Sequence, residues 1–231
     1  KFPDRIRETF GMNDNILGSI EFDLTNANVQ VLHDGIANIT NNKIDGIWHM
    51  AANLSFRESD RANILSVNVI GTRNIISLAN HIDCPLFHIS TAYVHGNNQG
   101  VFYEGYHDRP MRFNNPYEES KFLGEQVVYE QYSSRTIIFR PSILIENNSI
   151  RMSNFGYYSF VLSLLRARNS ISSNTLEIVP KIPLPFLCSR IANLNLMPVE
   201  VATDLMLNIA KKDEALGQIF HICNPHEFLV S

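Results

Sequence analysis

The sequence of 231 residues lacks the features that mark several large classes of protein. It has only three cysteines, Cys84, Cys188 and Cys223, which are odd in number, widely spaced and without a C-x-x-C pair. This pattern predicts free, mostly buried thiols rather than a disulfide framework. No stretch approaches the roughly 18 apolar residues that a spanning helix needs, and the polar first segment does not resemble a signal peptide. We expect no membrane span and a cytoplasmic protein.

An excess of charge of one sign is also missing. Nineteen Lys and Arg face 23 Asp and Glu, for a formal net charge of −4, and the longest basic run is Lys211-Lys212. Without a basic surface, nucleic acid and anionic lipid are poor candidates as partners. The histidines His49, His88 and His95 have no Cys or carboxylate at ligand spacing, so we predict no metal site. The sequence contains neither a P-loop nor a G-x-S-x-G hydrolase elbow.

The composition is that of one soluble α/β domain, with 45% hydrophobic and 18% charged residues. Apolar, β-branched runs predict strands at Ile16–Leu24, Ile44–Met50, Pro85–Ser90, Arg135–Arg140 and Gln218–Cys223. Apolar residues at three- and four-residue spacing predict helices at Ala62–His81, Pro116–Tyr132 and Pro198–Lys211. This alternation predicts a doubly wound, Rossmann-type parallel sheet, whose ligands bind at the carboxyl ends of the strands.

The segment Glu146–Asn195 interrupts the alternation, because it is rich in Asn, Ser and Pro. We interpret it as a small substrate-side subdomain inserted into the domain. The predicted organisation is therefore an α/β core over residues 1–145, the insertion over 146–195, and a return to the core over 196–231.

Tyr117 and Lys121 stand four residues apart at the start of a predicted helix, in NPYEESKFLGE, so their side chains share one face. A fixed cation close to a phenol lowers its pKa, and Lys121 could supply that cation. Such a phenol can give a proton to a carbonyl oxygen while hydride reaches the carbon. A pair at this spacing also arises by chance, so an incidental helix pair is the alternative.

Thr91 follows the predicted strand of LFHIST, where a hydroxyl at the carboxyl end of a strand points into the ligand crevice. It could hydrogen-bond the same carbonyl oxygen as Tyr117. Capping or turn formation is the alternative role for a threonine in this place. The order of Thr91, Tyr117 and Lys121 along the chain favours the catalytic interpretation of all three.

Several segments together resemble the ordered landmarks of extended short-chain dehydrogenases/reductases. They are WHMAANLSF, NVIGT, FHISTAY, NPYEESKFLGEQ, FRPSIL and MPVEVATDLM, and they cover nearly the whole chain. Within that superfamily, HISTAY, RPSI and PVEVA look most like fatty acyl-CoA reductases and thioester-reductase domains, the male-sterility-like NAD-binding group. The resemblance gives Thr91 the hydroxyl role and Tyr117 the acid/base role, while Lys121 tunes Tyr117 and holds the nicotinamide ribose.

The resemblance also implies supporting residues. Asn68, in the predicted helix Ala62–His81, would support the hydrogen bonds of the active site, and a satisfied buried amide is the alternative. An adenine contact, a small-residue turn and a nicotinamide contact are expected in three separate segments. The residues implied in binding the cofactor are Asp23, Leu24, Met50, Ala51, Ala52, Pro141, Ser142 and Ile143, together with Tyr117 and Lys121. A turn aspartate and a structural Pro141 are the alternatives for two of these segments.

A glycine-rich turn between a first strand and helix, which would hold the pyrophosphate of the cofactor, is absent. The glycines of GMNDNILG, Gly11 and Gly18, precede a predicted strand instead. We therefore expect that the first strands and this turn, roughly 35–45 residues, precede Lys1 in the natural protein. Mass spectrometry of the active protein tests this, since an authentic N-terminus at Lys1 would contradict it.

The resemblance implies NADPH-dependent reduction of an acyl thioester, carried by CoA or an acyl carrier protein, to aldehyde or alcohol. NADP is the expected cofactor, with NAD possible. The segments Phe155–Leu165 and Ile182–Leu187 could offer apolar surface to an acyl chain. The alternatives are a nucleotide-sugar epimerase or dehydratase or a small-carbonyl reductase on the same scaffold, and a regulator that senses NAD(P) without turnover.

Overall fold

The computed structural model describes residues 20–26, 29–40, 44–107, 112–146, 161–166, 193–226 and 228–229. A four-stranded sheet of order β1-β2-β3-β7 lies at its centre, and each neighbouring pair of strands is parallel. The strands are β1 (Ile47–His49), β2 (Leu86–Ile89), β3 (Thr136–Pro141) and β7 (Ile219–Ile222). The predicted α/β fold with a Rossmann-type parallel sheet is confirmed, and the carboxyl ends of all four strands meet at one edge.

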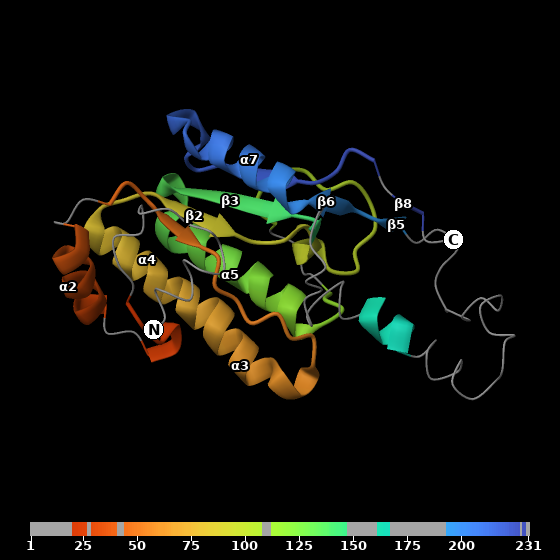
Figure 1. The fold of residues 1–231 in the computed structure, drawn as a ribbon, viewed down its shortest axis with the longest axis horizontal. Coiled ribbons are helices and arrows are strands. Elements are labelled where there is room, and N and C mark those ends of the chain that lie inside the picture. Colours follow the sequence, from red (N-terminus) through yellow and green to blue (C-terminus); the bar gives the residue numbers. More distant parts are fainter. Residues whose placement is uncertain are drawn as a thin grey trace, which may run out of the picture.

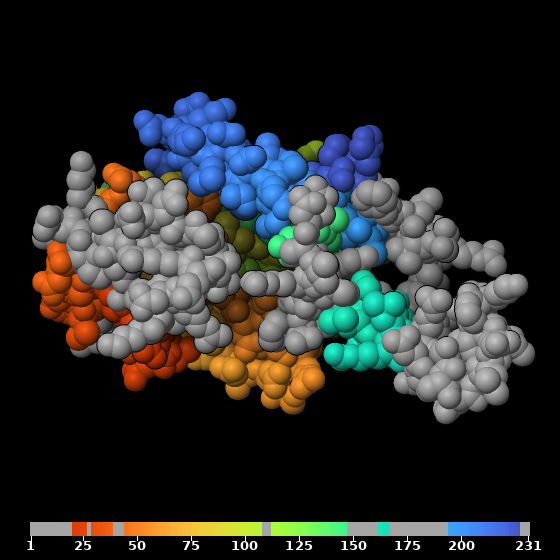
Figure 2. Space-filling model, in the orientation of Figure 1, coloured from red at the N-terminus to blue at the C-terminus, as the bar shows by residue number. Residues whose placement is uncertain are grey.

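Helices cover both faces of this sheet (Figure 1). One face carries α2 (Val29–Thr40), α5 (Pro116–Tyr132) and a long helical segment between them in sequence. This segment is divided into α3 (Arg61–Leu65), the π-helical turn η3 (Ser66–Ile70) and α4 (Gly71–Ile82). The other face carries α7 (Val199–Ala210). In the space-filling view α7 and the α3–α4 segment lie on opposite sides of the molecule (Figure 2).

The remaining elements are short. The 3-10 helices are η1 (Leu24–Asn26), η2 (Glu58–Asp60), η4 (Ala92–His95), η5 (Ser133–Arg135) and η7 (Asp213–Ala215). Two small two-stranded sheets pair β4 (Ile143–Ile145) with β6 (Leu196–Pro198) and β5 (Asn193–Leu194) with β8 (Phe228–Leu229).

The core is two apolar clusters separated by the sheet. One packs α4 and α5 against the sheet and includes Leu78 and Val128, and the other packs α7 against it and includes Phe139 and Met206. All six residues of β3 are buried, which explains why this strand forms a nearly continuous apolar run in the sequence rather than an alternating one.

Most predicted boundaries differ from the observed ones by one to three residues. The helix Pro116–Tyr132 is confirmed without change, and Ala62–His81 is one residue shorter at each end than the observed helical segment. The strand predicted at Ile16–Leu24 is wrong over its described part, because residues 20–23 are irregular and Leu24 begins η1. A strand needs a partner for its backbone groups, and no other described strand pairs with β1 on the side away from β2. The helix α2 was not predicted.

The insertion predicted at Glu146–Asn195 leaves the core from β4 and returns to it at β6. These two strands pair side by side and parallel, so the segment between them departs and returns at one place on the domain. Only residues 146, 161–166 and 193–195 of the segment are described, with a helical turn over 161–166. Its substrate-side role stays a prediction; Ile182–Leu187 and most of Phe155–Leu165 lie outside the described residues.

Three other sequence expectations concern absences. Cys84 is buried and Cys223 half-buried, both as free thiols, whereas Cys188 lies outside the described residues. No group of three metal-ligating side chains that could hold an ion occurs in the described part of the chain. None of the helices found there is long and apolar enough to cross a bilayer.

A buried ion pair joins α5 to β3. The Arg140 Nε donates to Glu125 Oε1 at 2.9 Å and Nη2 donates to Oε2 at 2.6 Å, and both side chains are almost fully buried. Arg140 Nη2 also donates to the carbonyl of Gly105 at 3.0 Å. Because the geometry is bidentate, the pair fixes the position of α5 on the sheet and ties the loop after η4 to it.

Replacing Glu125 by alanine should lower the free energy of unfolding by about 3–5 kcal/mol, because it leaves the Arg140 guanidinium buried without its counter-charge. Urea unfolding measures this. Glu130→Ala, at an exposed position on the same helix, is the matched control and should change stability by no more than about 0.5 kcal/mol. Equal effects of the two substitutions would contradict the role of the pair.

Candidate active site

The start of α5 sets the position of Tyr117. Asn115 caps the helix, with its Oδ1 accepting from the Glu118 backbone N–H at 3.0 Å, and Pro116 occupies the first helical position. The Glu118 carboxylate in turn accepts from the Asn114 backbone N–H at 2.9 Å. These reciprocal bonds resemble a capping box and fix the first turn of the helix. Tyr117, the second residue of α5, is therefore held at a rigid helix start.

Thr91 lies at the carboxyl end of β2 and opens η4. Its Oγ1 accepts from the Tyr93 backbone N–H at 3.3 Å, so Thr91 caps η4, which is the alternative role that we considered for it. The same side chain lies within hydrogen-bonding reach of the phenol of Tyr117 and acts to lower its pKa. Gly96 ends η4 with φ of 59°, and a side chain there would collide with the backbone carbonyl of Arg112. The structure thus brings Thr91 and Tyr117 together from two elements.

Burial raises the pKa of Tyr117 to about 12. The hydrogen bond from Thr91 acts in the opposite direction, and the nearby carboxylate of Glu118 raises the pKa further. The ring of Phe56, with its centroid 5.7 Å away, packs beside the Tyr117 ring. The expectation of a lowered pKa is not met here. The phenol is protonated at neutral pH, which is the form that can donate a proton.

Lys121, one turn further along α5, is held by the backbone at the end of β2. Its buried Nζ donates to the carbonyl of Ile89 at 2.6 Å, at the last residue of β2. Burial lowers the pKa of Lys121 to about 8, and the carboxylate of Glu125 only partly opposes this. Burial and the charge of Lys121 together also lower the pKa values of His49 and His88 beneath it. The ammonium is thus held at the edge of the sheet by a backbone carbonyl.

Asn68, in the π-helical turn η3, connects three parts of the site. Its Oδ1 accepts from the Asn53 backbone N–H at 2.7 Å, and its Nδ2 donates to the Asn53 carbonyl at 3.0 Å and to Ser120 Oγ at 2.8 Å. Ser120 Oγ donates to the Tyr117 carbonyl at 2.7 Å. The amide is therefore the satisfied buried group that we considered as an alternative, and it reaches Tyr117 through Ser120. Its direct contact with a substrate or cofactor stays a prediction.

The segments predicted to hold the cofactor at the ends of β1 and β3 lie at the carboxyl edge of the sheet. Met50 and Ala51 follow β1 and are exposed. Pro141 is the last residue of β3, and Ile143 is the first residue of β4. The hydroxyl of Ser90 is buried, with no hydrogen-bond partner among the described residues. Ser142 is also buried and lies against the Cys223 thiol, whose pKa burial raises and hydrogen bonding with Ser142 lowers. A buried hydroxyl without a partner at this edge fits the amide and ribose groups of a nicotinamide nucleotide.

Asp23, which we predict to contact adenine, is part of a tight turn. Its Oδ1 accepts from the backbone N–H and the hydroxyl of Thr25, each at 2.8 Å, and these bonds lower its pKa. The carbonyl of Leu24 accepts from Asn74 Nδ2 at 2.7 Å, which attaches the turn to α4. Asp23 therefore has the turn-forming role that we considered as the alternative to an adenine contact. The adenine contact remains a prediction.

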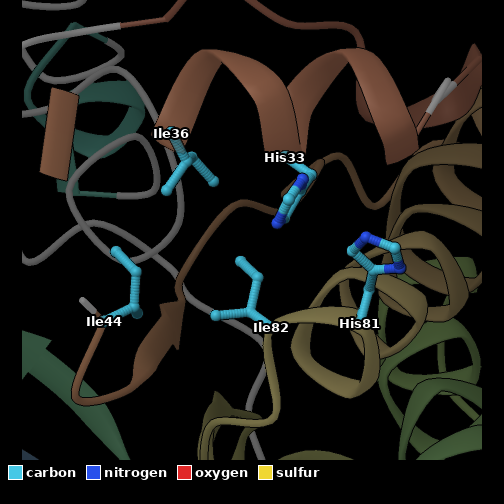
Figure 3. Close-up of a pocket in the computed structure, with 5 residues that line it drawn as sticks. All are labelled: His33, Ile36, Ile44, His81 and Ile82. Atoms are coloured by element: carbon cyan, nitrogen blue, oxygen red, sulfur yellow. The ribbon is translucent and has the colours of Figure 1, made fainter. Parts of the chain in front are cut away.

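A cleft of about 760 Å³ opens beside η4, next to Thr91. It is lined by Ala92, Tyr93, His95, Phe102, Ser142, Asn195, His221, Cys223, Asn224, Pro225 and His226. Most of these residues were not predicted, because they come from loops that are distant in sequence. A second, smaller cavity of about 110 Å³, between α2 and the end of α4, contains His33 and His81 and shares no residue with the site (Figure 3).

A parallel sheet wound by helices on both faces, with polar groups at its carboxyl edge, defines a Rossmann-type dinucleotide-binding fold. The model of the NAD-binding family described as "Male sterility protein" matches residues 17–206, so the chain belongs to that family. The resemblance inferred from the sequence motifs is confirmed. No curated protein matches the chain significantly.

Solved structures share the fold at low sequence identity. The terminal R domain from the myxalamid PKS-NRPS biosynthetic pathway is 22% identical with a TM-score of 0.73, over 99% of this chain and 57% of that one. The dTDP-glucose 4,6-dehydratase of Bacillus anthracis, in complex with NAD, is 19% identical with a TM-score of 0.63, and the match covers 91% of this chain and 59% of that one. A short-chain dehydrogenase/reductase superfamily protein from Agrobacterium tumefaciens, with bound NAD, is 20% identical with a TM-score of 0.64, over 90% and 66%. The chain thus spans under two thirds of each of these proteins.

The buried ammonium of Lys121 makes stability depend on pH in a defined direction. The unfolded chain keeps this proton up to about pH 10.5, whereas the folded chain releases it near pH 8. Between these values the unfolded state binds more protons, so the free energy of unfolding should rise with pH, by about 3 kcal/mol at most.

Urea unfolding from pH 7.5 to 10.5 measures this rise as the difference between wild type and Lys121→Met. The variant has no such proton, so the wild type should gain stability relative to it. Lys211→Met, at an exposed position, is the control and should show a constant difference. A constant difference for Lys121→Met as well would contradict the lowered pKa.

Proposed function

We propose that the protein reduces an acyl thioester to an aldehyde or alcohol with a nicotinamide cofactor, NADP rather than NAD. One observation carries the proposal: the Thr91 hydroxyl and the Tyr117 phenol meet at the carboxyl edge of an NAD-binding fold, beside a cleft. Two O–H groups that meet in this way can bind one carbonyl oxygen, which is the group that gains negative charge during reduction.

Tyr117 is the acid of the proposed reaction. Its raised pKa keeps the proton on the phenol at neutral pH, and the proton moves to the carbonyl oxygen of the substrate as negative charge develops there. Thr91 donates a hydrogen bond to the same oxygen and orients the carbonyl. The reduced nicotinamide, when bound, supplies the hydride. Loss of the thiol from the resulting hemithioacetal then gives the aldehyde.

Lys121 has a second task in the proposed reaction. A bound nicotinamide ribose would place hydroxyls near its Nζ, and the ammonium would hold them as it holds the carbonyl of Ile89. The segments Met50–Ala52 and Pro141–Ile143 would hold the rest of the nucleotide, with the buried hydroxyl of Ser142 near the nicotinamide amide. Asn68 positions Tyr117 through Ser120.

The described part of the cleft favours a thioester over a nucleotide sugar. Its described lining contains no lysine or arginine, the side chains that most often bind the phosphate oxygens of such a ligand. The imidazoles of His95 and His221 do not replace such cations, because burial, reinforced by the nearby guanidinium of Arg140, lowers their pKa values. A neutral thioester with an apolar acyl chain fits this lining. An acyl carrier protein as donor and a cytoplasmic location are part of the same proposal.

Two alternatives share the scaffold. A nucleotide-sugar epimerase or dehydratase has a specific likeness in its favour, the fold of the dTDP-glucose 4,6-dehydratase. A regulator that senses NAD(P) without turnover would not need the contact between Thr91 and Tyr117, and this contact counts against it.

A substrate panel separates these functions. The full-length protein should oxidise NADPH, seen as a loss of absorbance, with an acyl-CoA or a carrier-bound acyl thioester, and not with UDP- or dTDP-sugars. Net oxidation with none of the thioesters would contradict the proposal. Conversion of a nucleotide sugar without net oxidation would support the epimerase alternative.

Tyr117→Phe should lower kcat by at least about a hundredfold, because it removes the acid but leaves the ring. The affinity for NADPH, measured by fluorescence titration, should stay close to that of the wild type. Tyr129→Phe, at an exposed tyrosine of the same helix, is the matched control and should leave kcat unchanged. A Tyr117→Phe variant with wild-type kcat would exclude Tyr117 as the acid.

A further inference from the structure

His95 is a buried imidazole whose polar atoms are unused. Its side chain is only 8% exposed, it lines the cleft, and neither ring nitrogen has a hydrogen-bond partner among the described residues. Its ring stacks on Phe102 at 4.0 Å between centroids, and the rings of His107 and His221 meet it edge-on at 4.5 and 5.5 Å. These ring contacts hold the imidazole firmly but satisfy neither nitrogen.

Packing alone does not explain a histidine at this position. Phenylalanine would make the same stacking contact with Phe102, without the penalty for burying a donor and an acceptor that lack partners. Polar groups that stay unsatisfied inside a protein, at the wall of a cleft, are typical of sites that receive their partner from a ligand. His95 thus has the features of a ligand-binding residue.

The charge state of His95 defines the ligand. Burial, followed by the neighbouring His107 and Arg140, lowers its pKa to about 3, so the ring is neutral at physiological pH and has one N–H donor and one N acceptor. A neutral ring gives no advantage to phosphate or carboxylate. A secondary amide, which also has one donor and one acceptor, is the complementary neutral group.

The position of His95 relates this site to the reaction. It ends η4, the same short helix that Thr91 opens, and Ala92 and Tyr93 between them also line the cleft. A substrate whose carbonyl lies against Thr91 and Tyr117 would extend along η4 toward His95. The part of an acyl thioester on the sulfur side of its carbonyl is a pantetheine arm, and this arm carries secondary amides.

We propose that His95 is a positioning residue that binds a secondary amide of the pantetheine arm of the substrate. The inference rests on the proposed thioester reduction and adds how the thiol side of the substrate is recognised. It assigns the sulfur side of the substrate to η4.

Two matched substrates test this in the full-length protein. One is an N-acetylcysteamine thioester, which carries one amide, and the other is an S-alkyl thioester of the same acyl group and similar length without the amide. His95→Phe should lower kcat/KM about tenfold for the first, the value of one lost hydrogen bond, mainly through KM. It should leave kcat/KM for the second unchanged. His95→Gln, which keeps a donor and an acceptor, should restore much of the loss.

Equal loss on both thioesters, or loss on neither, would overturn the role of His95 while leaving thioester reduction intact. Calorimetric titration with free pantetheine tests the binding without turnover. The wild type should bind it and His95→Phe should bind it about tenfold less tightly; equal binding, or no binding by the wild type, would also overturn the proposal. Pantetheine binding that depends on His95, without NADPH oxidation on any thioester, would keep the amide site and refute the proposed reaction.

A destabilised variant would not obscure the result. Thermal melting of wild type, His95→Phe and His95→Gln shows whether the variants fold. If His95→Phe does not fold, histidine-labelled NMR of the wild type takes its place, with the His95 signals identified by their absence in His95→Gln. Pantetheine should shift these signals, and unchanged signals at saturation would contradict the contact.

Discussion

The buried amide of Asn68 is the constraint on which the site depends. It ties the loop after β1 to α5 by bonding Asn53 through both its donor and its acceptor and by donating to Ser120. At Gly124 the two helical segments approach so closely that an added Cβ would lie 3.2 Å from the Asn68 carbonyl. The strand ends on which a cofactor would rest and the helix that carries Tyr117 are therefore parts of one hydrogen-bonded unit.

Burial, rather than the charge of Lys121, decides the protonation of the site in this structure. The spacing of Tyr117 and Lys121 favours a phenol with a lowered pKa, but the phenol is half-buried beside Phe56 and the ammonium is occupied by the Ile89 carbonyl. Desolvation therefore raises the pKa of Tyr117 and lowers that of Lys121. Both shifts favour the neutral forms, which suits a site that gives a proton to a carbonyl oxygen.

The sequence predicted what depends on local patterns and missed what depends on pairing in space. The helix of Tyr117 was predicted with both ends correct from its apolar residues at helical spacing, and Asn115, Pro116 and Glu118 form its start in the structure. The α2 helix could have been found from Val29, Leu32 and Ile36, which follow helical spacing. The strand predicted at Ile16–Leu24 is wrong over residues 20–24, because a strand requires a neighbour that no local pattern reveals.

The residues of the site divide in the same way, into those that local motifs predict and those that depend on tertiary packing. Thr91 and Tyr117 were predicted from motifs and lie within hydrogen-bonding reach of each other. His95 was considered as a metal ligand and excluded as one, and its place at the cleft was missed because its ring contacts come from distant loops. The π-helical turn that holds Asn68 has no sequence signal comparable to a cap. Likewise, the pairing of Arg140 with Glu125 across α5 and β3 is a property of tertiary packing.

In the proposed reaction, hydride reaches a carbonyl carbon held by Thr91 and Tyr117. Mass spectrometry of the product formed from an acyl thioester and NADPH deuterated at the transferred position of the nicotinamide tests this step. The aldehyde should carry one deuterium at its carbonyl carbon, and an alcohol one for each reduction step. A product without deuterium, or release of the free acid alone, would contradict the claim.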